Sequence, residues 1–387
     1  MIYLADIIEA YYIARRNKRR TADQTDFELH WEAGCTRLYQ DIINRRLQPT
    51  AYSFIAKKPK PREVFASDMA TRVLHHYLDL RLRPLLERMM SDHTYNNRKG
   101  MGQNACQNAV IEDIYEMSEG YTRDAYIVKL DLRGFFPNIL QDVVYNQLRD
   151  VIEKQYFGRD KDDLLYILQV CVFSYPTLHC ENYSAPHQRA DIERGKSLFD
   201  KPLGVGGAIG HLIWQNAANW YLHEIDEWLD VNPDIRSERY VDDIYIVIRD
   251  KAQLGYIVPE IRAKLATLGA RLNERKFYCQ HWSKGVECLG VHIKGYNVYL
   301  NKRTLHNGMQ AARHLGRPSY GRIDKALSSI NSYLGAAKRL NGYKRAQELI
   351  AAIPQGWWRY LYYDEKNMTL KAKQSRRERL VYRYKLR

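Results

Sequence analysis

Two adjacent aspartates, Asp242 and Asp243, interrupt a stretch that otherwise favours β-strands. The valine, isoleucine and tyrosine residues around them (residues 238–247) favour strands, whereas aspartate does not. The pattern therefore predicts a hairpin that carries both carboxylates at its tip. Neighbouring carboxylates repel each other, and burying them is costly unless a cation lies beside them. A divalent metal such as Mg²⁺ suits such oxygen ligands, and a solvated turn is the alternative interpretation of this stretch alone.

Asp131 ends another stretch that is typical of a strand, residues 125–131, whose other members are mostly apolar. An aspartate at the end of a buried strand is costly unless it has a partner or a function. If this strand lies beside the 238–247 hairpin in one sheet, the carboxylates of Asp131, Asp242 and Asp243 converge. We therefore treat the three aspartates as one candidate site.

Three converging carboxylates could hold two Mg²⁺ ions about 4 Å apart and support an in-line displacement at phosphorus. One ion would lower the pKa of an attacking 3′-hydroxyl, and the other would neutralise charge on the leaving pyrophosphate. Asp131 and Asp242 would bridge both ions, and the carbonyl of Leu132 would complete the ion on the nucleotide side. Asp243 would either lie just behind the ligands or be an occasional ligand. Lys276, which follows the sheet in sequence, is placed to donate a proton to pyrophosphate.

The chain carries a strong positive charge. It has 60 Lys and Arg against 45 Asp and Glu, a net charge of +15, which favours a polyanionic partner such as nucleic acid. Residues 371–387 add a basic tail that fits a nucleic-acid backbone. The six cysteines include no CxxC pair, which fits reduced thiols in a cytoplasm better than a disulfide framework. No stretch is apolar for long enough to span a membrane, so no membrane partner is expected.

A second hairpin is predicted over residues 51–67, with prolines that stiffen its turn. Lys58, Lys60 and Arg62 crowd positive charge at the tip of this hairpin. Such a tip could clamp a triphosphate or the backbone of a nucleic acid.

Two glycine-containing stretches could approach a ligand closely. Residues 95–102 form a basic loop whose glycines permit close backbone contact. Residues 204–210 lead into a helix, and such an approach to a helix N-terminus can lie against a nucleotide or a template strand. The third glycine of a dinucleotide-binding fingerprint is missing at its required spacing, which argues against that class of site.

The remaining segments are predicted mainly as helices. Apolar residues recur at helical spacing along residues 68–90, which predicts an amphipathic helix there. Further helices are predicted over residues 1–50, 211–229, 252–268 and 301–387, and over a segment that begins at 137 or 138 and ends at about 172. Strands are predicted at 287–293 and 297–300, and a surface loop at 173–201.

In their order and content these stretches resemble a reverse transcriptase of the bacterial type. The resemblance implies an RNA-directed DNA polymerase in which Phe136 is a steric gate that excludes the ribose 2′-hydroxyl. It matches Asp131 and Phe136 to motif A and residues 240–243 to the YxDD of motif C. Motif D is matched by Leu272, Asn273 and Lys276, and the primer grip by Leu289 and Gly290. Lys58 and Arg62 match the fingers residues that hold the triphosphate.

Within that family the sequence is most similar to the reverse transcriptases of diversity-generating retroelements. Residues 61–76, 98–102 and 209–215 carry this likeness. Ile209 takes the place of a glutamine near the incoming nucleotide and the template base, and an apolar side chain cannot make the hydrogen bonds of an amide. The resemblance therefore implies misincorporation opposite template adenines. Trp214 departs from the usual serine of this motif.

The resemblance also implies ligands and partners. Nucleotide binding is implied for Lys58, Arg62, Phe136, Ile209 and Gln215. Primer or template contacts are implied for Arg98, Lys99, Gly210, Trp214, Leu289 and Gly290. The implied partners are a template RNA, a primer or cDNA, dNTPs and a small helical accessory protein. Two Mg²⁺ ions would be the cofactors, and the location would be the cytoplasm of a bacterial, phage or archaeal host.

The expected fold class is α+β, a right-hand polymerase. We expect an N-terminal region and fingers over residues 1–120 and a palm over 121–297, with an antiparallel sheet packed on helices. The palm would carry motifs A to E and an insert at about 173–201. An all-helical thumb would cover residues 298–387, including the basic tail. The alternatives are a retron or abortive-infection reverse transcriptase and, in another class, a catalytically silent RNA-binding scaffold.

Overall fold

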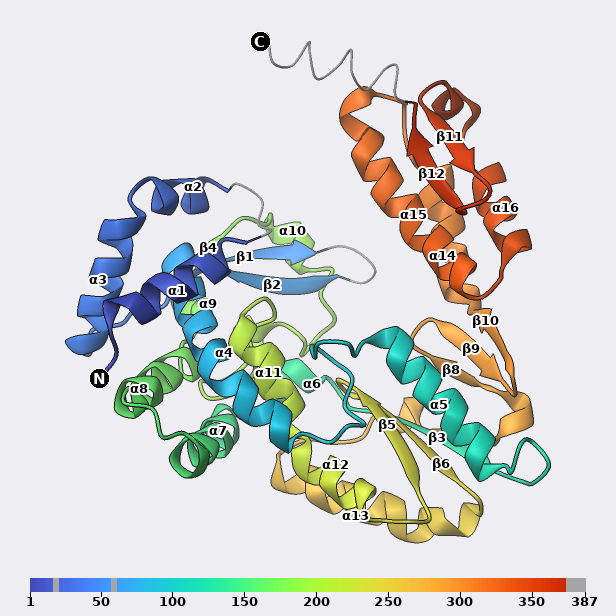
Figure 1. Cartoon of the computed structure of the whole chain (residues 1–387), viewed down its shortest axis with the longest axis horizontal. Helices are drawn as coiled ribbons and strands as arrows, with labels where there is room; N and C mark the ends of the chain where they lie inside the picture. Colours follow the sequence, from blue (N-terminus) through green and yellow to red (C-terminus); the bar gives the residue numbers. More distant parts are fainter. Residues whose placement is uncertain (17–20, 57–60, 374–387) are drawn as a thin grey trace. The chain divides into compact units, whose positions relative to one another are not determined.

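The computed structural model describes residues 1–16, 21–56 and 61–373. These residues fall into two compact units (Figure 1), which are described separately below. The larger unit comprises Met1–Asp113 and Val128–Cys279, and the smaller unit comprises Ile114–Ile127 and Gln280–Arg387.

A four-stranded sheet carries the predicted aspartates. Its strands, in the order β5-β6-β3-β7, are Arg236–Tyr240, Asp243–Ile248, Tyr126–Asp131 and Tyr278–His281. β5 and β6 form an antiparallel hairpin in which Tyr240 pairs with Asp243, so that Val241 and Asp242 make the turn. The predicted hairpin and the predicted strand at 125–131 are thus confirmed. The expectation that the two lie side by side in one sheet is confirmed as well.

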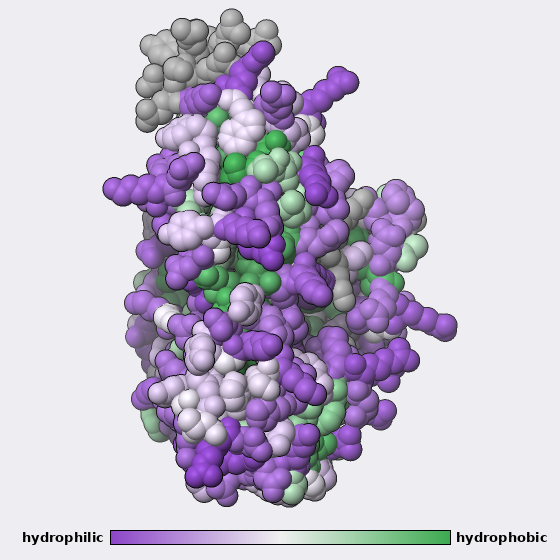
Figure 2. All heavy atoms as spheres, turned by 90° about the vertical axis from the view of Figure 1, so that its right-hand side faces the viewer, coloured by the Kyte–Doolittle hydropathy of each residue, from purple (hydrophilic) through white to green (hydrophobic). Residues whose placement is uncertain are grey.

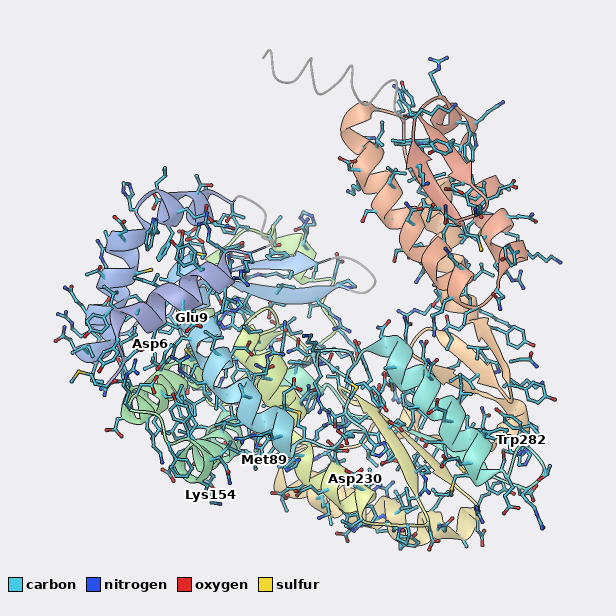
Figure 3. All side chains as sticks on the ribbon, in the orientation of Figure 1. Asp6, Glu9, Met89, Lys154, Asp230 and Trp282 are labelled. Atoms are coloured by element: carbon cyan, nitrogen blue, oxygen red, sulfur yellow. The ribbon has the colours of Figure 1, made fainter. Side chains whose placement is uncertain are left out.

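Helices make up most of the larger unit. The predicted amphipathic helix is α4 (Met69–Met89), which buries its apolar stripe and begins where the side chain of Asp68 accepts a bond from the Thr71 N–H. Arg81 of α4 forms ion pairs with Asp6 and Asp160, and Asp6 is marked in Figure 3. The other helices include α1 (Leu4–Ala14), α2 (Ala22–Leu29), α3 (Trp31–Ile43), α5 (Gln103–Met117), α6 (Phe135–Asn138), α7 (Gln141–Gln155), α8 (Lys161–Val172) and α13 (Leu254–Thr267).

Two helix predictions need correction. The segment 211–229 is two helices, α11 (Leu212–Tyr221) and α12 (His223–Asp230), because Leu222 leaves the helical conformation with φ −102° and ψ 8°. The break lets α11 pack on α4 and α7 while α12 packs on β5 and α13. The helix expected to begin near residue 137 begins at Gln141 instead, since the single turn α6 ends at Ile139 in an extended conformation.

The second predicted hairpin is confirmed as β1 (Ala51–Ala56) and β2 (Arg62–Ser67), which pair in antiparallel fashion. The segment 173–201 is more than the surface loop that was predicted. Its short strand β4 (Glu181–Asn182) extends the hairpin sheet by pairing in parallel with β1. The same segment includes α9 (Pro176–His179), α10 (Pro186–Arg189) and a 3₁₀ turn at Leu198–Asp200. The backbone N–H of Leu198 donates to the carboxylate of Glu63 over 2.7 Å, which ties this segment to β2 as well.

The smaller unit contains a three-stranded sheet in the order β10-β9-β8, with β8 at Val286–Cys288, β9 at Val291–Lys294 and β10 at Asn297–Leu300. The prediction of one strand over 287–293 is therefore wrong. Leu289 and Gly290 have positive φ angles of 44° and 94°, which is the conformation of a tight two-residue turn between antiparallel strands.

The C-terminal part of the smaller unit is mainly helical, with α14 (Lys302–Arg313), α15 (Ile323–Arg339) and α16 (Tyr343–Ala351). It is not all-helical as predicted, because β11 (Leu361–Asp364) and β12 (Thr369–Ala372) form an antiparallel hairpin. The Asn331 side chain donates to the Leu370 carbonyl and accepts from the Leu370 N–H, over 2.9 and 2.7 Å, and so holds β12 on α15. The α+β fold class is otherwise as expected.

One face of the molecule is largely polar. Figure 2 shows hydrophilic residues over most of one face. Among the helices that the structure describes, none combines the length and the apolar character needed to cross a membrane.

A glycine between β2 and α11 offers a test of this packing. Gly210 has φ +113°, and a Cβ there would lie 2.3 Å from the Phe65 carbonyl oxygen. We expect Gly210→Ala to lower the free energy of unfolding by about 1–3 kcal/mol, measured by denaturant titration. The control is Gly255→Ala in helix α13, because a Cβ at Gly255 would meet no other atom within 4 Å. Equal stability of Gly210→Ala and the wild type would contradict the described packing.

Candidate active site

The three predicted aspartates meet at one edge of the four-stranded sheet. Asp131 is the last residue of β3, Asp243 is the first residue of β6, and Asp242 lies in the turn before it. Burial, followed by the charges of Asp243 and Asp131, raises the pKa of Asp242 from 3.8 to about 6. Burial and the charge of Asp131 also raise the pKa of Asp243. The three carboxylates are therefore close enough to repel one another.

Two lysines and an asparagine surround these carboxylates. The Lys276 ammonium donates to Asp131 Oδ2, and Asn273 Nδ2 donates to Asp131 Oδ1 over 3.1 Å. On the other side, Lys129 Nζ lies 3.5 Å from Asp243 Oδ1. The structure thus places the predicted residue Lys276 against Asp131.

Lys129 is a residue of this site that the sequence interpretation missed. It stands two positions before Asp131 on β3, and residues two apart on a strand point to the same face. The signal that could have identified Lys129 is a single lysine two residues before an aspartate in an otherwise apolar strand.

The donor set suits a hard divalent cation. Mg²⁺ prefers carboxylate oxygens as ligands. Burial and the charges of Asp243 and Asp131 disfavour the ionised form of Asp242, and a cation beside it would offset that cost. Among the described residues, no group of three or more His, Cys, Asp or Glu side chains is already arranged as a metal-ligand set. The carboxylates of Asp131 and Asp243 pair with lysines instead.

The glycine loop at residues 204–210 lies between the turn that follows β3 and strand β2. The N–H of Gly207 donates to the Phe136 carbonyl over 2.8 Å, and the N–H of Phe65 donates to the Ile209 carbonyl over 2.7 Å. The side chains of Phe136 and Ile209 are both half-buried. Backbone hydrogen bonds therefore bring these two predicted nucleotide-binding residues into one region.

Helix α11 supports this loop through Trp214. The indole is 1% exposed, and a Cβ on Gly207 would lie 2.8 Å from its ring. The absence of a side chain at Gly207 thus makes room for the bulky indole of Trp214. Because the indole is buried, it packs inside the protein beneath the glycine loop. Gln215, the next residue, is exposed.

The basic residues predicted to contact ligands differ in their surroundings. Arg62 is exposed at the start of β2, and Lys58 lies outside the described residues. The guanidinium of Arg98 donates to the carbonyls of Ser91 and Thr94, over 2.6 and 3.0 Å, so it organises its own loop. Its neighbour Lys99 is exposed.

Leu289 and Gly290, the predicted primer grip, form the turn between β8 and β9 in the smaller unit. The hydroxyl of Thr304 donates to the Gly290 carbonyl over 3.0 Å, which fixes this turn on α14. Gly210, by contrast, belongs to the larger unit and is exposed beside β2.

A family model for reverse transcriptases (RNA-dependent DNA polymerases) matches residues 55–293, more than half of the chain. This chain belongs to the reverse transcriptase family. The matched region contains the three aspartates, Phe136 and Lys276. No curated protein matches the sequence.

Solved structures with a similar fold include telomerases of two yeasts. The telomerase of Candida albicans, in complex with a fragment of telomeric RNA, is 12% identical with a TM-score of 0.46, over 87% of this chain and 61% of that one. The apo telomerase of Candida tropicalis is 12% identical with a TM-score of 0.48, over 82% of this chain and 62% of that one. The chain thus spans about three fifths of the length of these telomerases, and the similarity is too distant to assign a function.

The carboxylate repulsion in this reverse transcriptase predicts a gain in stability on mutation. The pKa of Asp242 is higher in the folded protein, about 6 against 3.8, so its ionised form destabilises the metal-free fold at neutral pH. We expect Asp242→Asn to raise the melting temperature in EDTA at pH 7.5 by on the order of 2–4 °C. The gain should shrink as the pH falls from 6 toward 4, because Asp242 is then protonated in the wild type.

The control for this experiment is Asp92→Asn, since the side chain of Asp92 is 94% exposed. This change should leave the melting temperature within error of the wild type. A melting temperature of Asp242→Asn at or below that of the wild type at pH 7.5 would show that the folded protein does not disfavour the ionised form of Asp242.

Proposed function

We propose that this chain is an RNA-directed DNA polymerase that copies a template RNA into cDNA. The observation that carries the proposal is the meeting of Asp131, Asp242 and Asp243 at one sheet edge, within the region that matches the family. A net charge of +15 supports a nucleic-acid substrate. Enzymes that transfer nucleotides use such carboxylates to hold divalent metals.

The proposed ligands of two Mg²⁺ ions are the carboxylates of Asp131, Asp242 and Asp243 and the carbonyl of Leu132. When bound, the ions supply Lewis-acid stabilisation of the charge that develops in nucleotidyl transfer. Lys276, whose ammonium contacts Asp131, would release that carboxylate and hold a proton near the leaving pyrophosphate. Its side chain is 56% exposed, so it has room to move.

The remaining roles concern substrate recognition. The half-buried ring of Phe136 would exclude a ribose 2′-hydroxyl and so select dNTPs. Arg62 would pair with the triphosphate, and Arg98 would act by shaping the loop that carries Lys99. The other proposed contacts are Lys58, Ile209 and Gln215 with the nucleotide, and Gly210, Trp214, Leu289 and Gly290 with the primer or template.

In the proposed right-hand arrangement, residues 1–120 include the fingers, 121–297 form the palm and 298–387 form the thumb. A primer, dNTPs and a template RNA would be the substrates, in the cytoplasm. A small helical accessory protein completes the proposed set of partners.

The polymerase assignment is tested by Asp131→Asn. The loss of one carboxylate that would hold the metals should lower Mg²⁺-dependent dNTP incorporation on a primed RNA by on the order of 100- to 1,000-fold, while RNA binding remains. Asp242→Asn should behave alike. The control is Asp162→Asn, an exposed carboxylate at the start of α8. Wild-type incorporation rates in both site variants would refute the assignment.

A finer proposal is that the enzyme belongs to a diversity-generating retroelement and misincorporates opposite template adenines. Ile209 supports it, because its apolar side chain cannot make amide hydrogen bonds near the base pair. Its backbone carbonyl is fixed by the N–H of Phe65, so a changed side chain would act from the same position.

Replacement of Ile209 by glutamine tests this finer proposal. We expect Ile209→Gln to lower the error frequency opposite adenine, by on the order of 10-fold, measured by sequencing of cDNA made on a defined RNA. Ile209→Leu keeps an apolar side chain of similar volume and should retain the errors. An unchanged error spectrum in Ile209→Gln would show that residue 209 does not control base selection.

A further inference from the structure

The turn that carries Asp242 has an unfavourable backbone conformation. Val241 has a φ of +60°, in the left-handed region that residues other than glycine rarely adopt, and a β-branched side chain makes it still less favourable. Such a turn persists only where its surroundings hold it. The contacts around Val241 should therefore reveal which group does so.

The holding group is the guanidinium of Arg239, two residues before Val241. Arg239 is 2% exposed, and its Nη1 donates to the Val241 carbonyl over 2.9 Å. Its Nε donates to Asp226 Oδ1 over 2.7 Å, and its Nη2 donates to the Asn219 carbonyl over 2.9 Å. The rigid planar fork thus joins the turn to two other elements at once.

Those two elements are the helices on either side of the break at Leu222. Asn219 lies in the last turn of α11, where backbone carbonyls lack a partner within the helix. Asp226 lies in the first turn of α12 and also accepts a bond of 3.0 Å from the Thr94 hydroxyl. The charge of the buried guanidinium is therefore balanced, and its position is fixed from both helices.

The consequence for Asp242 follows from the planarity of the peptide bond. The carbonyl of Val241 and the N–H of Asp242 belong to one rigid unit, so a fixed carbonyl also fixes where the Asp242 residue begins. The backbone of Arg239 is held independently, because its N–H donates to His93 and its carbonyl accepts from Tyr95, over 2.8 and 3.0 Å. Besides the pairing of Tyr240 with Asp243, the side chain of Arg239 links this framework to the Val241 carbonyl.

We propose that Arg239 is a positioning residue that holds the Val241–Asp242 peptide in its left-handed turn and so directs the Asp242 carboxylate toward Asp131. Its effect on catalysis rests on the proposed polymerase function, whereas its effect on the turn does not. Lysine cannot replace it, because an ammonium lacks the planar fork that reaches three acceptors on separate elements.

The test compares Arg239→Lys in the wild-type and Val241→Gly backgrounds, because glycine adopts the left-handed turn without a steric cost. In the wild-type background, kcat for primer extension should fall on the order of 100-fold, with KM for the primed template nearly unchanged. In the Val241→Gly background the same substitution should lower kcat by a much smaller factor. The matched control is Arg236→Lys on the same strand, because the Arg236 guanidinium donates to the carbonyls of Pro233 and Ile235, and it should leave kcat unchanged. An equal loss of kcat in both backgrounds would overturn the proposal.

A second measurement does not depend on polymerase activity. Hydrogen exchange of the amides at residues 241–243 should become faster in Arg239→Lys, while exchange within α4 stays the same. Unchanged exchange at the turn would overturn the inference. If the wild type shows no primer extension, the polymerase function is refuted. The hydrogen exchange of residues 241–243 then decides the role of Arg239 by itself.

If Arg239→Lys does not fold, Asp226→Asn takes its place, since it keeps the shape of the anchor and removes its charge. Asp226→Asn should lower kcat and speed up hydrogen exchange at the turn in the wild-type background, and both effects should be much smaller in the Val241→Gly background. Its failure to show that dependence would count against the proposal.

Discussion

The repulsion among three carboxylates at one sheet edge is the constraint that the larger unit of this reverse transcriptase must satisfy. Burial raises the pKa values of Asp242 and Asp243, and the charge of Asp131 raises both as well. Lys129 from β3 and Lys276 from the segment after α13 offset part of that charge. The fold thus holds together groups that would separate in a more stable arrangement, which is expected where a site is selected for chemistry.

Local sequence patterns predicted the parts of the fold that depend on local interactions. The hairpin at β5 and β6 and the helix α4 were evident, because their periodicity and turn residues lie within each segment. The break at Leu222, the pairing of β4 with β1 and the hairpin of β11 and β12 were not evident. Each of these depends on contacts with residues that are distant in sequence, and no glycine or proline marks the break.

The same distinction applies to the site. Asp131 and Asp242 could be predicted, because a carboxylate at a strand end is conspicuous in the sequence. The family resemblance implied a primer or template contact for Arg98, and the structure adds that its guanidinium donates to carbonyls of its own loop. Arg239 was not recognised, because its role depends on Asp226 and on a carbonyl of α11, and neither contact is visible in the sequence.

The glycine loop at residues 204–210 is held in place by contacts of its backbone and its glycines. Its backbone is bonded to the Phe136 carbonyl on one side and to the Phe65 N–H on the other, and Gly207 packs against the buried Trp214. None of these contacts uses the side chain of Ile209. The backbone position of residue 209 is therefore set by its neighbours. For this reason the proposed role of its side chain in base selection can be tested by substitution while these backbone contacts remain.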